Sequence, residues 1–85
     1  MTTTNYTVSD DAFTAITTSG DTQCAVQILE KGAVWIVDAS SLPSASTTGV
    51  RINQDVPTFT NNNIASGNVV YARSYSGDID IVVVT

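Results

Sequence analysis

Hydrophobic and polar residues alternate along several short runs of this chain, and this pattern predicts β-strands rather than helices. Between residues 24 and 29, alternate positions hold Cys24, Val26 and Ile28, which would lie on one face of a strand. Residues 33–37 are apolar throughout, as expected for a strand covered on both faces. No run places apolar residues at the i, i+3, i+4 spacing of a helix face. We therefore expect an all-β fold.

Short connections that contain glycine separate the clearest runs. Glu30-Lys31-Gly32-Ala33 follows the first run, and Ser76-Gly77-Asp78 lies between residues 68–75 and 79–85. A connection of this length with a glycine, between two strand-like runs, is typical of a β-hairpin. We expect one hairpin over residues 24–39 and another over residues 68–85, with Gly32 at a positive φ.

Further strands are predicted between the amino terminus and the final hairpin. Residues 13–18 are extended in this interpretation, and residues 49–53 form a strand with Val50 and Ile52 inward and Arg51 outward. Residues 56–60 contain Pro57, which places them at a sheet edge. The fold class is a small antiparallel β-sandwich, or a partly closed barrel, of six to eight short strands.

The length of 85 residues gives room for one domain. We expect residues 9–85 to form a single β-sandwich domain and residues 1–8, which are polar and rich in threonine, to form an N-terminal arm that reaches a neighbouring subunit. The contacts of this arm would come from Thr3, Thr4, Asn5 and Tyr6. A lone Cys24 and the absence of histidine leave neither a disulfide within the chain nor a structural zinc site. Association with other copies is the expected source of added stability.

The charge balance excludes two classes of partner. Three basic residues stand against eight acidic ones, for a net charge of −5. So few cations cannot form the basic stripe that a phosphate backbone requires, and we expect no nucleic-acid partner. The same argument excludes an anionic membrane surface, and no run approaches the roughly 20 apolar residues of a membrane span.

The residues also predict a protein without catalysis, cofactor or metal. A nucleophile needs an adjacent base, and without histidine the base would be Lys31, which sits in a tight turn. Cys24 on an alternating face is interpreted as a small buried hydrophobe rather than a reactive thiol. Asp78 and Asp80 offer only two carboxylates to calcium. Nothing in the spacing of the remaining candidates, Glu30, Asp38 and Asp55, selects a glycosidase-like pair.

The aromatic residues leave two interpretations open. Trp35 lies in an apolar strand, which favours a core anchor over a sugar-binding platform. Tyr71, Arg73 and Tyr75 share one face of a strand. Tyrosine and arginine are enriched at protein interfaces, so this face is a candidate contact surface. Its alternative is an ordinary outer face on which Arg73 stacks over a tyrosine ring.

Several short motifs resemble those of small virion proteins of tailed bacteriophages. They are Gly-Ala-Val-Trp-Ile-Val at residues 32–37, Leu-Pro-Ser-Ala-Ser-Thr-Thr-Gly-Val-Arg-Ile at 42–52, Val-Val-Tyr-Ala-Arg at 69–73 and Gly-Asp-Ile-Asp-Ile-Val-Val-Val at 77–84. The resemblance covers residues 24–85. Asn61-Asn62-Asn63 departs from it, because the family has connections rich in glycine and alanine there.

The resemblance implies a β-sandwich module associated with a phage head or tail. The leading hypothesis is a capsid decoration or cement protein that binds the outer shell, bridges subunits of the major capsid protein and is located in the virion. It further implies a homo-oligomer, with a trimer favoured by analogy with decoration proteins. The first alternative is a receptor- or glycan-binding module of a tail fibre or spike, which would use Trp35, Tyr71 or Tyr75. The second is a small acidic inhibitor that acts by mimicry.

Overall fold

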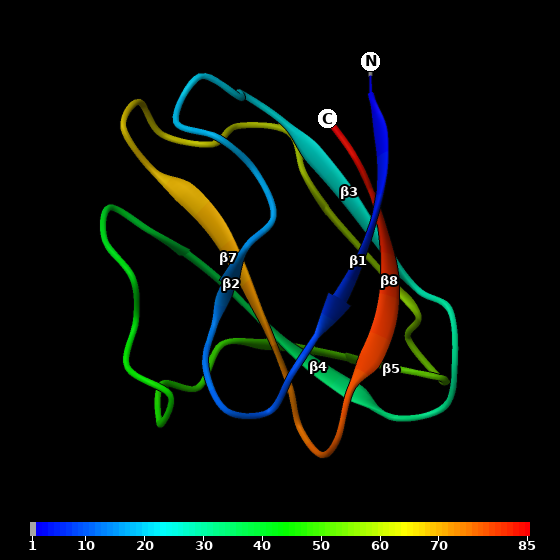
Figure 1. The fold of residues 1–85 in the computed structure, drawn as a ribbon. Coiled ribbons are helices and arrows are strands. Elements are labelled where there is room, and N and C mark those ends of the chain that lie inside the picture. Colours follow the sequence, from blue (N-terminus) through cyan, green and yellow to red (C-terminus); the bar gives the residue numbers. More distant parts are fainter. Residues whose placement is uncertain (1) are drawn as a thin grey trace.

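The protein is a sandwich of two four-stranded antiparallel sheets, as a computed structural model that describes residues 2–85 shows (Figure 1). Sheet A has the strand order β1-β8-β3-β6, and sheet B has the order β2-β7-β4-β5. The strands are β1 (Thr3–Val8), β2 (Thr14–Ala15), β3 (Cys24–Ile28), β4 (Ala33–Ala39), β5 (Val50–Asn53), β6 (Thr58–Asn61), β7 (Val69–Ser74) and β8 (Ile79–Val84). The predicted all-β sandwich is confirmed.

The core fills the space between the two sheets and follows the predicted alternation. In β3, Cys24, Val26 and Ile28 are buried while Gln27 is exposed. The same period of two operates in β4, β7 and β8, because successive side chains of a strand point to opposite faces. The fully buried aliphatic side chains of the two sheets meet here: Val8, Val26, Ile81 and Val83 from sheet A, and Val34, Ile52 and Val70 from sheet B.

Neither predicted hairpin forms, because consecutive strands mostly belong to different sheets. β3 lies in sheet A and β4 in sheet B, and β7 in sheet B precedes β8 in sheet A. Within residues 2–85, only β4 and β5 are neighbours both in sequence and in a sheet. Sandwiched sheets lie about 10 Å apart, and a four-residue connection spans up to roughly 14 Å. The glycine turns therefore cross from sheet to sheet. Gly32 has the predicted positive φ, at 132°, and Gly77 has 71°.

The predicted N-terminal arm is wrong for the residues that the structure describes; Met1 lies outside them. Residues 3–8 form β1, which pairs along its whole length with β8, from Thr3 opposite Val84 to Val8 opposite Ile79. Val8 is completely buried. An apolar residue at the end of this threonine-rich segment anchors it in the core, and one edge of the segment forms hydrogen bonds with β8 of the same chain.

Two predictions about the shorter strands have different outcomes. Ile52 is buried as expected, but Val50 is 52% exposed, because it stands at the start of β5 on an edge of sheet B. The prediction of an edge position for residues 56–60 is confirmed. Pro57 directly precedes β6, which is an edge strand of sheet A.

Gly49 provides a test of the β4–β5 connection, since a side chain there has no room. A Cβ atom at this position would overlap the carbonyl oxygen of Ile36 and approach Cγ2 of Val37 to 2.7 Å. We expect Gly49→Ala to lower the free energy of unfolding by about 1–3 kcal/mol, the usual cost of overpacking. Chemical denaturation would measure the loss.

The matched control is Gly20→Ala. Gly20 is exposed and a Cβ atom there has no neighbour within 4 Å, so the substitution should be neutral or stabilise by about 0.4–1 kcal/mol through the unfolded chain. Equal losses in the two variants would contradict the packing described around Gly49.

Candidate functional site

The outer face of sheet B gathers aromatic and basic side chains from three strands. The register places Trp35 of β4 between Arg73 of β7 and Arg51 of β5. Two residues further along β4, Val37 lies opposite Tyr71. Trp35, Tyr71 and Arg73 are half-buried and Arg51 is exposed. Tyr75 follows β7 directly and is 62% exposed. We call Trp35, Arg51, Tyr71, Arg73 and Tyr75 the aromatic-basic face.

Arg73 is anchored by two hydrogen bonds and an aromatic contact. Its Nη1 donates hydrogen bonds to the carbonyl oxygens of Asp10 (3.2 Å) and Ser74 (3.3 Å). Its guanidinium carbon lies 5.5 Å from the ring centre of Phe13, a cation–π distance. The proposed stacking partner was a tyrosine; the ring beneath Arg73 is instead Phe13, a buried residue outside the main core. The guanidinium of Arg73 therefore stacks on Phe13 rather than on a tyrosine ring.

Trp35 is not the core anchor that its apolar strand suggested. The neighbouring residues Val34 and Ile36 are buried in the core, so Trp35 points to the opposite face of sheet B. Its ring centre lies 6.3 Å from that of Tyr75, with the planes tilted by 48°, which is a favourable geometry for an aromatic pair. The pair gives the face a large, partly exposed aromatic surface.

A shallow hollow of about 440 Å³ adjoins this aromatic pair. Tyr75 and the basic residues Lys31 and Arg51 line it, together with the polar residues Asn53, Gln54 and Asp55. All three lysine and arginine residues of the chain thus lie on or beside the aromatic-basic face. The hollow also contains the carboxylate of Asp55, so its two basic side chains share the site with one acidic side chain.

The predicted interface residues fall into two groups that the fold keeps apart. Tyr71, Arg73 and Tyr75 belong to the aromatic-basic face of sheet B, whereas Thr3, Thr4, Asn5 and Tyr6 lie in β1 at an edge of sheet A. The predicted interface residues therefore belong to two separate surfaces.

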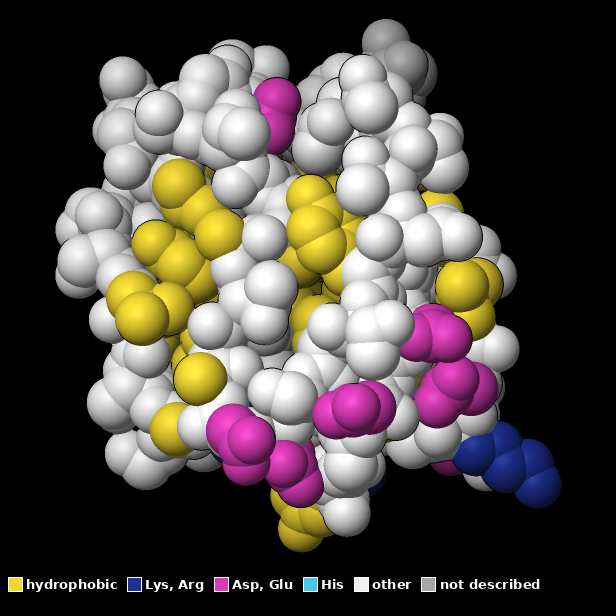
Figure 2. All heavy atoms as spheres, in the orientation of Figure 1, with side chains coloured by type: hydrophobic (Ala, Val, Ile, Leu, Met, Phe, Trp, Pro, Cys, Tyr) yellow, Lys and Arg dark blue, Asp and Glu magenta, His cyan; other side chains and the backbone are white. Residues whose placement is uncertain are grey.

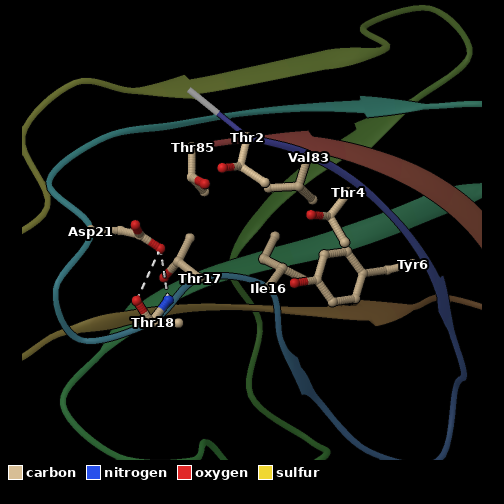
Figure 3. Close-up of a pocket in the computed structure, with 9 residues that line it drawn as sticks. All are labelled: Thr2, Thr4, Tyr6, Ile16, Thr17, Thr18, Asp21, Val83 and Thr85. Atoms are coloured by element: carbon tan, nitrogen blue, oxygen red, sulfur yellow. Dashed lines mark hydrogen bonds between the residues drawn. The ribbon is translucent and has the colours of Figure 1, made fainter.

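A second hollow, of about 280 Å³, opens at the end of the sandwich beside the first residues of β1 (Figure 3). Hydroxyl groups dominate its lining: Thr2, Thr4, Tyr6, Thr17, Thr18 and Thr85 surround it with Asp21. Oδ2 of Asp21 accepts hydrogen bonds from N (2.8 Å) and Oγ1 (3.3 Å) of Thr18. These groups can form hydrogen bonds, but the lining contains no basic side chain to pair with the carboxylate in acid–base chemistry.

Acidic side chains gather at the opposite end of the molecule (Figure 2). Three turns join there: N of Gly77 donates to Oδ2 of Asp10 (2.9 Å), and N of Leu29 donates to the carbonyl oxygen of Asp80 (3.1 Å). Asp80, one of the two candidate calcium ligands, accepts a hydrogen bond from Thr7. These turns carry the acidic residues Asp10, Asp11, Glu30 and Asp78, and Asp80 lies next to them in β8.

The other candidate chemistry has no assembled site in the described residues. Among residues 2–85, no three Cys, Asp or Glu side chains are grouped so that they could hold a metal ion. Oδ2 of Asp38 accepts a hydrogen bond from Asn61 (3.1 Å), which links β4 of one sheet to β6 of the other. Residues 2–85 also contain no helix long and apolar enough to cross a membrane.

Sequence reasoning missed Trp35, Arg51 and Lys31 as members of one surface. The sequence contained only part of the information needed to group these three residues. The sequence predicts an outward side chain for Arg51. For Trp35 it does not distinguish the outer face from the inner one, because residues 33–37 are apolar throughout. The position of Lys31 depends on how the chain crosses from one sheet to the other. A comparison with family models, curated proteins and solved structures found no match to this chain.

Cys24 leads to a test of the core by pH. Its side chain is 3% exposed, and burial, with smaller contributions from Asp38 and Asp21, raises the pKa of the thiol above its ordinary value of 9.0. The folded protein therefore holds this proton more tightly than the unfolded chain does. The associated stability is fully present below pH 9 and is lost as the pH rises through the raised pKa.

We expect the free energy of unfolding to decline more steeply above pH 9 in the native chain than in Cys24→Ala, measured by urea denaturation. Taking the difference between the two proteins removes every contribution that they share. If both proteins show the same slope, ionisation of Cys24 is not coupled to folding.

Proposed function

We propose that this protein is a non-enzymatic structural protein of a bacteriophage virion, which attaches to the outside of the capsid through its aromatic-basic face. Each copy would bridge neighbouring subunits of the major capsid protein. The resemblance of residues 24–85 to small phage virion proteins supports the class of particle. The observation that carries the mode of action is the clustering of Trp35, Tyr71, Tyr75 and two arginines on one sheet face.

The composition of this face fits protein binding. Trp, Tyr and Arg are the residue types most enriched among the side chains that dominate binding energy at interfaces. Trp35 and Tyr75 already contact each other, and Arg73 is held by Phe13 and two carbonyl oxygens. These contacts already restrict the side chains of Trp35 and Arg73 before binding, and this lowers the entropic cost of association.

The charge distribution suggests the chemistry of the partner surface. The three basic residues adjoin the aromatic-basic face, while acidic side chains gather at one end. A shell surface that presents carboxylates to sheet B would therefore be attracted and oriented, whereas the acidic end would be repelled from it. Cementing a shell requires no reaction, so the scarcity of acid–base pairs is no obstacle to this function.

The number of copies in purified particles tests the proposal. We expect quantitative mass spectrometry of virions of the phage that encodes the chain to find hundreds of copies per particle. A handful of copies would contradict decoration and favour a tail component. Complete absence from particles would overturn a virion role of either kind.

Binding to purified shells tests the face itself. Tyr75→Ala should weaken binding tenfold or more, about 1.4 kcal/mol, if this exposed ring is one of the residues that dominate the contact. The matched control is Gln27→Ala, an exposed residue on the outer face of sheet A, which should bind as the native chain does. Equal losses in both variants, or none in either, would count against this face.

A glycan-binding module is the second candidate, and the hollow beside Tyr75 is the observation that favours it. Its volume of about 440 Å³ lies within the range of ligand sites, and Asn53, Gln54 and Asp55 offer hydrogen bonds beside an aromatic ring. Binding of the native chain to immobilised glycans, lost in Tyr75→Ala and combined with a handful of copies per particle, would favour this candidate over decoration.

A further inference from the structure

The free edge of β1 presents a row of unused backbone hydrogen-bonding groups. β1 is the first strand of sheet A, and within residues 2–85 it pairs only with β8. The row continues through most of the strand, since Thr3, Thr4, Asn5 and Thr7 are exposed and Tyr6 is half-buried. Such an edge is a ready template for another strand.

The register identifies the groups that point away from the sheet. Thr2 and Thr85 exchange two backbone hydrogen bonds of 2.9 Å each. Hydrogen-bonded and non-hydrogen-bonded pairs alternate along an antiparallel ladder, so Thr4, Tyr6 and Val8 direct their backbone groups toward β8. Those of Thr3, Asn5 and Thr7 therefore point outward, away from the sheet.

The usual protection of sheet edges is missing from β1. Natural edge strands are shortened, or carry lysine, proline or other charges. β2 has two residues, β5 has four and contains Arg51, and β6 has four and follows Pro57. β1 has six residues, Thr3-Thr-Asn-Tyr-Thr-Val8, with no charge, no proline and no glycine. It is the longest edge strand in residues 2–85.

We propose that β1 pairs with β1 of a second copy of this chain, antiparallel and about a two-fold axis at Asn5. Identical strands that meet along the same edge form a self-complementary contact of this kind. Asn5 then lies opposite Asn5 of the second copy, and Thr3 opposite Thr7 of the second copy. These three pairs use every outward backbone group, and each pair exchanges two hydrogen bonds. The two A sheets join into one continuous sheet.

The distribution of charge favours a second copy in this orientation. Thr7 and its hydrogen-bond partner Asp80 lie at the acidic end, whereas Thr2 and Thr85 lie at the other end of β1. Antiparallel pairing places the acidic end of each copy beside the threonine-rich end of its neighbour, where Asp21 is the acidic residue that lines the hollow next to Thr2 and Thr85, and it keeps the two acidic ends apart. The two Thr7 residues, each at the acidic end of its own copy, are then roughly 14 Å apart along the strands. This distance exceeds the ~8 Å length over which salt screens charges at physiological concentration, so repulsion between the acidic ends is weak.

This contact goes beyond the proposed function and does not compete with it. The aromatic-basic face belongs to sheet B, so a dimer joined through sheet A leaves it free. The pairing also predicts a dimer, whereas the trimer expected for this chain rests on the phage resemblance alone. Failure of the dimer would leave the copy number in virions and the effect of Tyr75→Ala on shell binding unchanged.

Cysteine cross-linking tests the register. In Asn5→Cys the two new thiols face each other in a hydrogen-bonded pair with Cα atoms about 5.5 Å apart, which a disulfide can bridge. Thr3→Cys is the matched control, since its thiols would be roughly 14 Å apart along the strands. Native Cys24 is buried and does not interfere. Under mild oxidation we expect covalent dimers to form at least tenfold faster in Asn5→Cys than in Thr3→Cys. Equal rates would overturn the proposal.

A second pair of variants tests the backbone. Asn5→Pro removes an outward N–H without removing a bond to β8, and proline is tolerated at such edge positions. Asn5→Ala removes the same side chain but keeps the N–H. By sedimentation equilibrium up to millimolar concentration, the native chain and Asn5→Ala should show a dimer, and Asn5→Pro a monomer with a native circular dichroism spectrum. A monomeric native chain, a trimer, or a dimer that survives in Asn5→Pro would overturn the proposal.

Discussion

Burial of the two inner sheet faces against each other is the interaction on which the rest of this structure depends. Val8, Ile81 and Val83 of sheet A meet Val34 and Val70 of sheet B, all with 1% or less of their surface exposed. An isolated sheet of this size would leave its apolar face in water. Because the chain repeatedly crosses from one sheet to the other, neither sheet can be completed without the other, and we expect the two to fold together.

Because the inner faces of the two sheets form the core, only the two outer faces and the strand edges are available for contact with other molecules. The outer face of sheet B carries Trp35, Tyr71 and Arg73, held in place by β4 and β7 as neighbouring strands. The free edge of β1 presents outward backbone groups and the exposed polar side chains of Thr3, Asn5 and Thr7. The first surface suits recognition through side chains, and the second suits recognition through the main chain.

The crossing connections also organise the charge. Turns that follow β1, β3 and β7 meet at one end, where hydrogen bonds of Asp10 and Asp80 join them. Acidic residues in these turns therefore lie together at a distance from the threonine-rich end beside Thr2 and Thr85. A chain with eight acidic residues consequently has an uneven surface, with several acidic side chains at one end, Asp21 at the other and the three basic residues on or beside sheet B.

The sequence by itself determined most of the strand segments, with β1 as the exception, and in β3 it determined which side is buried. The two-residue period of Cys24, Val26 and Ile28, the positive φ of Gly32 and the edge position after Pro57 all follow from local chemistry. The tertiary structure alone decided that the glycine turns cross between sheets, that residues 3–8 pair with β8, and that Trp35 faces outward. The alternation of apolar and polar residues distinguishes the two faces of a strand but does not determine which strands pair with it. A four-residue turn can join strands within one sheet or across two, so the choice rests with the packing of the whole core.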